Sequence, residues 1–262
     1  MVVFLVRRIL ASVAVFWVVV TLTFIGLRVL PGGPFDLETG ASPEVLKNLS
    51  ERYGLDRPVW EQYGLYIGGL LQGDLGESYQ FDGRPVLDIL GESVPVTLTM
   101  GLLALILALG LGIPAGVYAA SRHGALGDSL LRILAMVGVS IPSFLLAPLL
   151  ILILSSGWPL YWLWPSVFSQ MESWGLFFPS ALWLGPKYWV LPVLTLAFRP
   201  MAFILRLTRA SFLEKVSKDF VRTARAKGLG TVSVFYRHLL KNSLGPVLAY
   251  GGPLIALSLI HI

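Results

Sequence analysis

Long apolar runs are the feature that most restricts the folds open to this chain. The first run extends from about Ile9 to Leu30, and about 20 consecutive apolar residues are enough for a helix to cross a hydrocarbon core of roughly 30 Å. Four further runs lie near residues 95–120, 131–155, 190–207 and 244–262. Their lengths predict an all-α polytopic membrane protein with five transmembrane helices, the last of which is marginal for one crossing.

The composition of the whole chain agrees with this prediction. Of the 262 residues, 55% are hydrophobic and only 13% are charged, whereas about a quarter of the residues of a soluble domain carry a charge. The formal net charge is +5, but the basic residues lie beside apolar runs, where membrane orientation explains them better than nucleic-acid binding does. The absence of cysteine excludes disulfides, thiolate catalysis and cysteine-ligated metal.

The first apolar run has an alternative interpretation as a secretory signal peptide. The apolar region of a signal peptide is about 7–15 residues long and ends at a small-x-small cleavage site. The run that follows Arg7 and Arg8 is longer and leads directly into Pro31-Gly32-Gly33-Pro34 without such a site. These features favour a retained helix.

The segments between the apolar runs alternate in composition. Residues 31–94 are acidic overall and poor in Lys and Arg, whereas the loop 121–128 and the segment 208–243 are basic. Residues 157–188 are rich in Trp, which is typical of a membrane interface. Because Lys and Arg concentrate in cytoplasmic loops, the N-terminus is expected in the cytosol. Three parts follow: a cytosolic N-terminus with the first helix over 1–30, an extracytoplasmic cap over 31–94, and a membrane core over 95–262 with a cytosolic loop over 208–243.

Glycine and proline mark two of the expected spans. Gly112 and Gly116 are four residues apart, a spacing that predicts a close helix contact within the membrane. Pro142 and Pro148 both fall in the span near 131–155. Each proline is either a kink with a gating role or a packing feature, and the sequence leaves both interpretations open.

Arg199 lies within the expected span 190–207. Placing an arginine at the centre of a membrane helix costs at least about 2.5–3.5 kcal/mol. Its side chain is therefore expected to face a pore or a second subunit, unless a shift of the span by one turn lets it reach the interface. Arg199 is thus the candidate for a pore or inter-subunit residue.

The segment 211–246 is the longest polar passage between two apolar runs. Asp219 to Lys227 has good helix formers, an acid in its first turn and bases toward its end, an order that suits the helix dipole. Gly228 is expected to end this helix. On a helical wheel Phe220, Ala224 and Lys227 share one side, which gives a short, exposed helix an apolar anchor among charges. Such an exposed helix either lies on anionic lipid headgroups, where each base contributes about 1 kcal/mol, or docks into another protein.

The run Arg222-Thr223-Ala224-Arg225-Ala226-Lys227-Gly228-Leu229 resembles the coupling loop, or EAA loop, of permease subunits in bacterial ATP-binding-cassette importers, in the form of the peptide-importer branch. The similarity covers essentially the whole chain and is greatest to the B-type permeases of oligopeptide and dipeptide importers. Other stretches agree with it: Pro31-Gly32-Gly33-Pro34-Phe35-Asp36, Leu55-Asp56-Arg57-Pro58, Pro142-Ser143-Phe144 and Ala249-Tyr250-Gly251-Gly252-Pro253.

This resemblance implies a type I importer permease fold in the bacterial cytoplasmic (inner) membrane. It implies that a second permease subunit completes the pore, that two cytosolic ATPase subunits bind the ATP, and that an extracytoplasmic peptide-binding protein delivers the substrate. The residues that the resemblance implies couple the permease to the ATPase are Asp219, Phe220, Arg222, Thr223, Ala224, Arg225, Ala226, Lys227 and Gly228.

Two departures from the family pattern stand out. The name EAA refers to a Glu followed by Ala residues, and in this chain Arg222 and Thr223 stand at the positions of the Glu and the first Ala. This change is typical of the peptide branch. Permeases of this family also continue into a sixth helix, so the chain, which stops at Ile262, is expected to be truncated at its C-terminus.

The sequence carries no sign of chemistry of its own. It lacks the G-x-x-x-x-G-K-[ST] phosphate loop of an ATPase, and His123, His238 and His261 are too scattered for a metal or catalytic site. We therefore expect a transport subunit that is not an enzyme and binds no cofactor or metal. The alternative of an ion-gradient-driven secondary transporter is disfavoured because no Asp or Glu lies in an expected span. Within the importer class, nickel or oligosaccharides are the alternatives to a peptide substrate.

Overall fold

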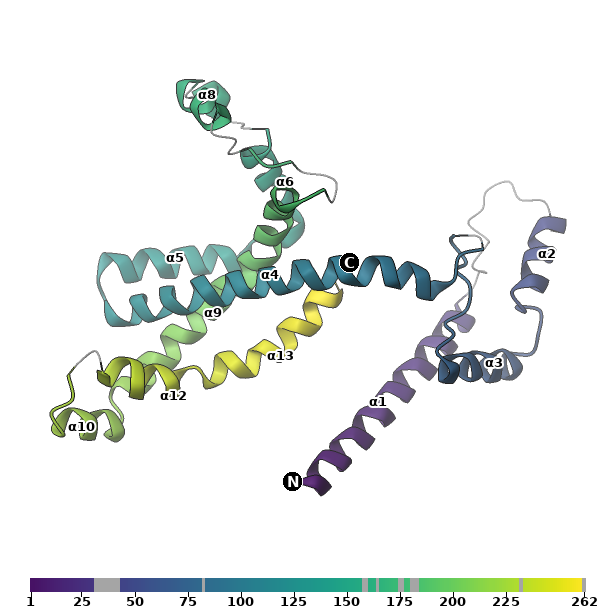
Figure 1. Cartoon of the computed structure of the whole chain (residues 1–262), viewed down its shortest axis with the longest axis horizontal. Helices are drawn as coiled ribbons and strands as arrows, with labels where there is room; N and C mark the ends of the chain where they lie inside the picture. The colour runs from purple at the N-terminus through teal and green to yellow at the C-terminus, as the bar shows by residue number, and fades with distance from the viewer. Residues whose placement is uncertain are drawn as a thin grey trace. The chain divides into compact units, whose positions relative to one another are not determined.

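The computed structural model divides the chain into two compact units, Met1–Glu92 and Ser93–Ile262. Helices make up most of the described residues of both units (Figure 1). The Pro31–Asp36 stretch, several of the Trp residues of 157–188, and the last two residues of the chain lie outside the described residues. The structure describes residues 1–30, 43–81, 83–156, 160–163, 165–173, 177–179, 184–230 and 233–260.

The first unit begins with α1 (Val2–Val29), the apolar helix expected from the first run. Two shorter helices follow, α2 (Pro43–Arg52) and α3 (Val59–Gln72). Pro58 precedes the first turn of α3, and Gly73 ends the helix with a φ of +80°, a left-handed conformation that glycine adopts without steric cost.

Aromatic side chains hold α3 against the C-terminal part of α1. The buried ring of Phe24 lies 5.3 Å from the ring of Tyr63 and 5.6 Å from that of Tyr66, centroid to centroid. Close by, the Nε of Arg28 donates a hydrogen bond of 2.8 Å to the Oε1 of Gln62. The part of the expected cap next to α1 is therefore ordered around an aromatic core.

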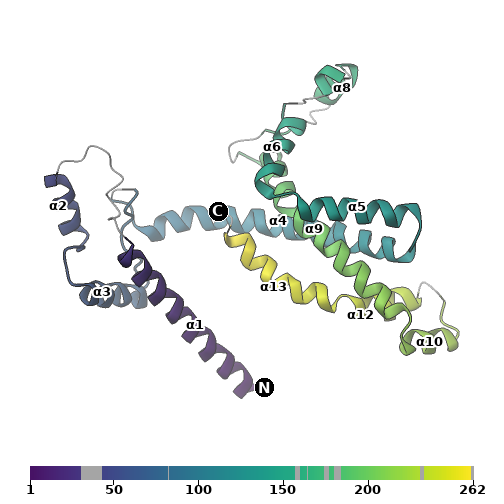
Figure 2. The same cartoon turned by 180° about the vertical axis from the view of Figure 1, so that it is seen from behind.

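The second unit is organised around α9 (Pro186–Val216). α4 (Val86–Ser121), which starts before the boundary of the unit, and α5 (Leu126–Ser140) lie beside α9 in both opposite views (Figures 1 and 2). Small residues allow these helices to approach closely. A Cβ built on Gly138 of α5, for example, would be 2.7 Å from the Cβ of Ala202.

The close contact predicted from the glycine pair of α4 is confirmed. A Cβ at Gly112 would lie 2.9 Å from the carbonyl oxygen of Met201, and one at Gly116 would lie 2.6 Å from that of Leu205. Real Cβ atoms essentially never approach other atoms so closely. Glycine at these two positions therefore allows the α4 backbone to touch the α9 backbone.

The third expected span is broken at Pro142. α5 ends at Ser140, α6 (Ser143–Leu154) begins two residues after Ile141, and the two helix axes differ by 112°. Proline disfavours the helical conformation of the residue before it, and Ile141 is accordingly extended, with φ −74° and ψ 122°. Pro148 lies inside α6 without ending it, so only the first of the two prolines interrupts the helix.

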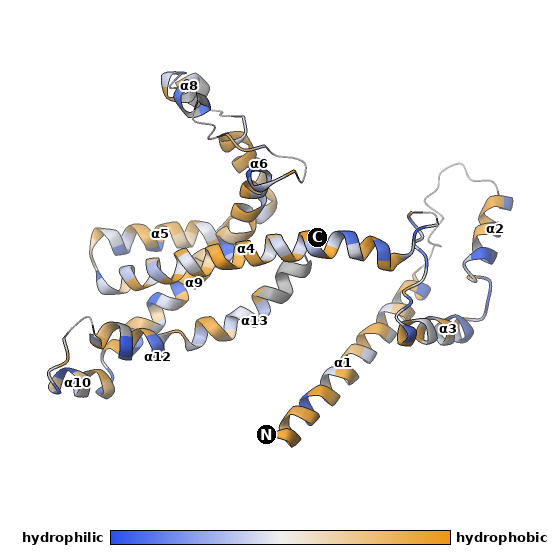
Figure 3. Ribbon diagram, viewed as in Figure 1, coloured by the Kyte–Doolittle hydropathy of each residue, from blue (hydrophilic) through white to orange (hydrophobic). Residues whose placement is uncertain are grey.

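Several helices in the described part of the chain are long and apolar enough to span a membrane, as expected of an integral membrane protein. α1, α4 and α9 are each long and apolar enough to cross a bilayer, and α5 with α6 makes a fourth candidate as a broken span. The fifth expected span corresponds to α13 (Gly245–Ile260), which has 16 residues. Apolar residues run along α1 and α6, whereas polar residues gather on α10 (Figure 3).

Two short helices, α7 (Leu160–Leu163) and α8 (Pro165–Ser173), follow α6. They fall in the Trp-rich segment 157–188. Among its described aromatic side chains, Trp162 is largely exposed, which fits the interfacial position expected of such residues.

Candidate functional site

α9 continues beyond the end of the expected fourth span. The apolar run stops near residue 207, but the helix extends to Val216 because no proline or glycine interrupts residues 201–216. Only Ser217 and Lys218 then separate it from the next helix, α10 (Asp219–Ala226). The first quarter of the segment 208–243, which was expected to be a loop, thus continues a helix long enough to cross the membrane.

α10 is the helix predicted from the sequence over Asp219 to Lys227. Asp219 lies in its first turn and Arg225 in its last, an arrangement that the helix dipole favours. Gly228 follows with a φ of +75°, and the N–H of Leu229 donates to the carbonyl of Ala224 at 3.3 Å. This left-handed turn ends the helix in the way expected from the sequence.

The inner face of α10 is formed by Val221 and Ala224, which are 0% and 4% exposed. They pack in one apolar cluster with Ala120 of α4 and Phe212 of α9. The structure separates the two apolar residues that the helical wheel places on one side, since Ala224 is buried whereas the side chain of Phe220 is 37% exposed. Residues three apart share a face of a short helix, and the sharp turn after α9 directs the 221/224 pair, not Phe220, toward the rest of the unit.

The outer face of α10 carries the remaining candidate coupling residues. The ion pair between Arg222 and Asp219 spans 3.7 Å, and these side chains are 75% and 96% exposed, so solvent screening leaves it little stabilising effect. The helix presents one large apolar side chain, Phe220, among free or weakly paired charges. The other exposed residues of this stretch are Thr223, Arg225, Ala226, Lys227 and Gly228.

The segment that follows α10 packs against its buried face. A π-helical segment, η1 (Val234–Leu240), and α12 (Lys241–Ser243) connect α10 to α13. The ring of Phe235 packs 4.8 Å from that of Phe212, and the Nζ of Lys215 donates a hydrogen bond to the carbonyl of Asn242. The end of α9, α10 and η1 therefore share one core.

Arg199 lies near the middle of α9, about 20 Å from its first residue and about 26 Å from its last at 1.5 Å per residue. It lines a cavity of about 500 Å³ together with Thr195, Phe203 and Tyr250. Within the part of the chain that the structure describes, no acidic side chain pairs with it. The cavity is otherwise mostly apolar, with Gly101, Ala104, Leu105, Val139, Ser143, Leu196, Pro200 and Leu254 completing its lining.

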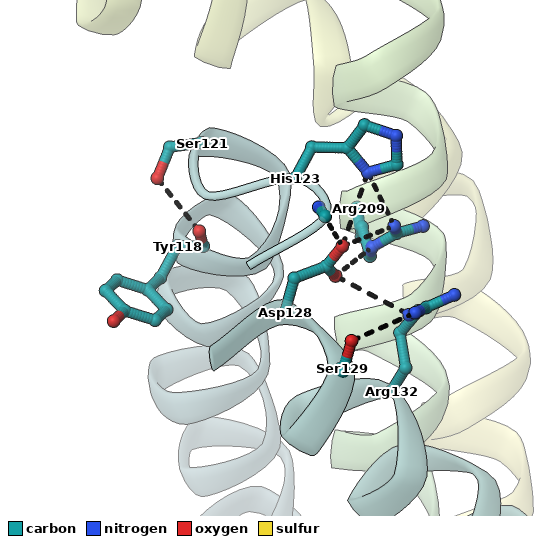
Figure 4. A network of polar contacts seen from close by, with 8 residues as sticks. Tyr118, Ser121, His123, Asp128, Ser129, Arg132 and Arg209 are labelled. Atoms are coloured by element: carbon teal, nitrogen blue, oxygen red, sulfur yellow. Dashed lines mark hydrogen bonds and ion pairs between the residues drawn. The ribbon is translucent and has the colours of Figure 1, made fainter. Parts of the chain in front are cut away.

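Asp128 forms a polar network that the sequence analysis missed (Figure 4). Its side chain is 0% exposed and accepts two hydrogen bonds from Arg209, from Nε at 2.6 Å and from Nη2 at 2.9 Å. The N–H of Gly124 donates a third at 3.0 Å. Asp128 and Arg209 lie outside the expected spans, and the hydrogen bonds from Arg209 hold the pKa of the Asp128 carboxyl well below its usual value.

A sequence signal for this network did exist. Between Glu92 and Glu214 the chain has only two acidic residues, Asp128 and Glu172. A lone acid in a loop that is otherwise basic is a candidate for burial against a base. The sequence did not identify its partner, however, because Arg209 is 81 residues away.

Comparisons with known proteins agree with this geometry. Residues 112–262 match the family described as binding-protein-dependent transport system inner membrane component, and residues 1–101 match the N-terminal family of such membrane components. The chain belongs to this family. These two matches cover both the helices that contain the glycine contacts and the segment that contains α10.

Individual relatives are similar in sequence to this chain along most of their own length. The oligopeptide transport system permease protein OppB of Salmonella typhimurium is 37% identical over 95% of this chain and 77% of its own length. The dipeptide transport system permease protein DppB of Bacillus subtilis is 37% identical over 97% of this chain and 77% of its own length. OppB of Escherichia coli is 38% identical, with the same coverage as the Salmonella protein.

Proposed function

We propose that this transport component is the permease subunit of an ATP-driven peptide importer in the bacterial cytoplasmic membrane, with its N-terminus in the cytosol. It forms part of the translocation pathway with a second permease subunit. Two separate ATPase subunits bind the ATP, and an extracytoplasmic peptide-binding protein supplies the substrate. The peptide assignment is supported by relatives that are named for oligopeptide and dipeptide transport, and the orientation by the basic loops.

The observation that carries this proposal is the position of α10. A coupling element must be fixed to the membrane helices on one face and free to bind the ATPase on the other. Val221 and Ala224 provide the fixed face, because they are buried in the core of the unit. Phe220 and the basic residues provide the free face.

The free face has the composition of a helix that binds in a groove. One aromatic side chain, Phe220, is available to fill an apolar pocket of the partner. A few anchor residues of this kind usually supply most of the binding energy of an interface. Arg222 and Arg225 surround it and would orient the helix against acidic groups at the rim of the groove. Lipid binding, the alternative for a basic helix, is tested by the same variants.

The test uses the full complex with its ATPase subunits. Arg222→Glu combined with Arg225→Glu should weaken ATPase binding at least about tenfold, because it opposes like charges across the contact. Phe220→Ala should weaken binding as well. The control is Arg122→Glu, a single reversal of the same kind on an exposed residue of the other expected cytosolic loop, and it is compared with Arg222→Glu and Arg225→Glu made singly as well as together.

Retention of the ATPase subunits is measured by co-purification in detergent. The proposal requires the Arg222/Arg225 and Phe220 variants to lose ATPase while Arg122→Glu keeps it. Full retention by both α10 variants would overturn it and leave lipid binding as the role of the helix. These substitutions are preferable to a change at Ala224, which is buried and would disturb the unit itself.

Arg199 is assigned to the pore or to the contact with the second permease subunit. Its position near the middle of α9, in a cavity and without a described acidic partner, supports either place. A guanidinium at such a position is not stable against lipid. Arg199→Met should therefore reduce peptide uptake or assembly with the second permease subunit, and an unchanged complex with unchanged uptake would contradict the assignment.

A further inference from the structure

The ion pair of Asp128 and Arg209 connects two parts of the second unit that are 81 residues apart in the sequence. Asp128 is in the first turn of α5, just after the loop that joins α4 to α5. Arg209 is in the last third of α9. Both side chains point into the contact between these helices (Figure 4), and Arg209 is only 16% exposed.

The geometry of the pair fixes the position of α5 along α9. Two parallel hydrogen bonds join the guanidinium to the carboxylate, and such a fork is specific in direction as well as in distance. The Nδ1 of His123 accepts a further hydrogen bond from Arg209 at 3.0 Å. The loop before α5 is therefore also attached to α9.

The pair lies next to the support of α10. Phe212 follows Arg209 by three residues, about one helical turn, and it is buried in the cluster that contains Val221 and Ala224. A displacement of α10 must therefore move the end of α9 that holds Arg209. Toward the end of α5, its contacts with α9 are made by apolar residues such as Gly138 and Ala202, and these contacts provide no comparable directional bond.

We propose that Asp128 and Arg209 are a positioning pair that makes α5 follow the movement of α10. This inference rests on the proposed function of α10 as the coupling helix. When the ATPase subunits displace α10, the pair transmits the displacement to the start of α5 as well as along α9. α5 ends at the break before Pro142, so the displacement reaches the bend between α5 and α6.

The test compares transport with ATP hydrolysis in the complete complex reconstituted in liposomes with its binding protein. Asp128→Asn removes the charge and should increase the number of ATP molecules hydrolysed per peptide imported at least about threefold. Arg209→Lys keeps the charge but loses the two-pronged bond, and should increase the same ratio. Arg132→Gln is the matched control, because Arg132 approaches the same carboxylate at 3.8 Å but is 51% exposed; its ratio should equal that of the wild type.

The ratio separates this role from a purely structural one. A structural pair would lower the amount of assembled complex but leave the ratio of the assembled fraction unchanged. An unchanged ratio in Asp128→Asn overturns the proposal, and if that variant does not assemble, an unchanged ratio in Arg209→Lys overturns it. Failure of the wild type to import any peptide would instead overturn the proposed function, so the two failures are distinguishable.

Discussion

Replacing Gly116 by alanine should force α4 and α9 apart. A Cβ at this position would lie 2.6 Å from the carbonyl oxygen of Leu205 and 2.7 Å from the Cβ of Thr208. Ordinary contacts of a Cβ begin at 3.4 Å. Because interiors are close-packed, the helices would have to separate locally by the difference of about 0.8 Å.

The energetic cost follows from which atoms are in the way. The nearest atom belongs to the α9 backbone and cannot rotate away as the end of a flexible side chain can. Overpacking of this kind typically costs about 1–3 kcal/mol. Alanine also gains about 1 kcal/mol over glycine within a helix, so the variant needs a control that has the same gain without the contact.

Gly110→Ala provides that control. Gly110 lies in the same helix, and a Cβ built on it meets nothing within 4 Å. The difference in unfolding free energy between the two variants therefore isolates the contact, and we expect Gly116→Ala to be less stable than Gly110→Ala by about 1–3 kcal/mol. Reversible unfolding of the purified complex in mixed detergent micelles measures this difference. Equal stability of the two variants would refute the close approach of α4 to α9.

Three further changes have defined outcomes. Gly228 has a φ of +75°, so Gly228→Ala should destabilise the end of α10 by about 1–2 kcal/mol, seen as faster hydrogen exchange of the Leu229 amide; unchanged exchange would contradict the left-handed turn. The affinity of the wild type for its ATPase subunits should fall as salt is raised from about 0.1 M, where the Debye length is about 10 Å, and an affinity independent of salt would show that the bases of α10 do not contribute. Finally, the lowered pKa of Asp128 means that its stabilising effect is complete above the unfolded pKa of about 3.9 and is lost only as the pH falls through the folded value. The stability difference between wild type and Asp128→Asn should therefore not decline from about pH 8 to pH 5, and a decline within that window would contradict the burial of the ion pair.

Features that depend on neighbouring residues were predictable from the sequence. The apolar runs predicted the long helices α1, α4 and α9, because the length of a run and the width of a bilayer are directly comparable. The start and end of α10 followed from an acid in the first turn and from Gly228. The spacing of Gly112 and Gly116 predicted a close contact, although not that α9 is the partner.

Features that depend on distant residues were not predictable in the same way. The helical wheel places Phe220 and Ala224 on one side of α10, but the direction in which the chain leaves α9 buries Val221 with Ala224 and leaves Phe220 exposed. Pro142 and Pro148 look alike in the sequence. They differ in the structure because the residue before Pro142 is extended, whereas Pro148 lies within a continuous helix. The pairing of Asp128 with Arg209 requires the fold itself, since 81 residues separate them.

The contacts of α9 occur in an order that bears on the mechanism. Arg199 lies near its middle, in the cavity. The atoms nearest to Gly112 and Gly116 follow and include the backbone N of Arg209, and the cluster that holds α10 comes last. The nearest α9 atoms at both glycines are backbone carbonyl oxygens, which cannot rotate away, so α4 and α9 cannot come closer at that level. On the proposed function, a displacement of α10 therefore acts on the stretch of α9 from 201 to 216, which is held against α4 at the glycine contacts. Arg199 and Pro200 line the cavity just before this stretch, and because a proline inside a helix removes one backbone hydrogen bond, α9 can bend between the cavity and its cytosolic end.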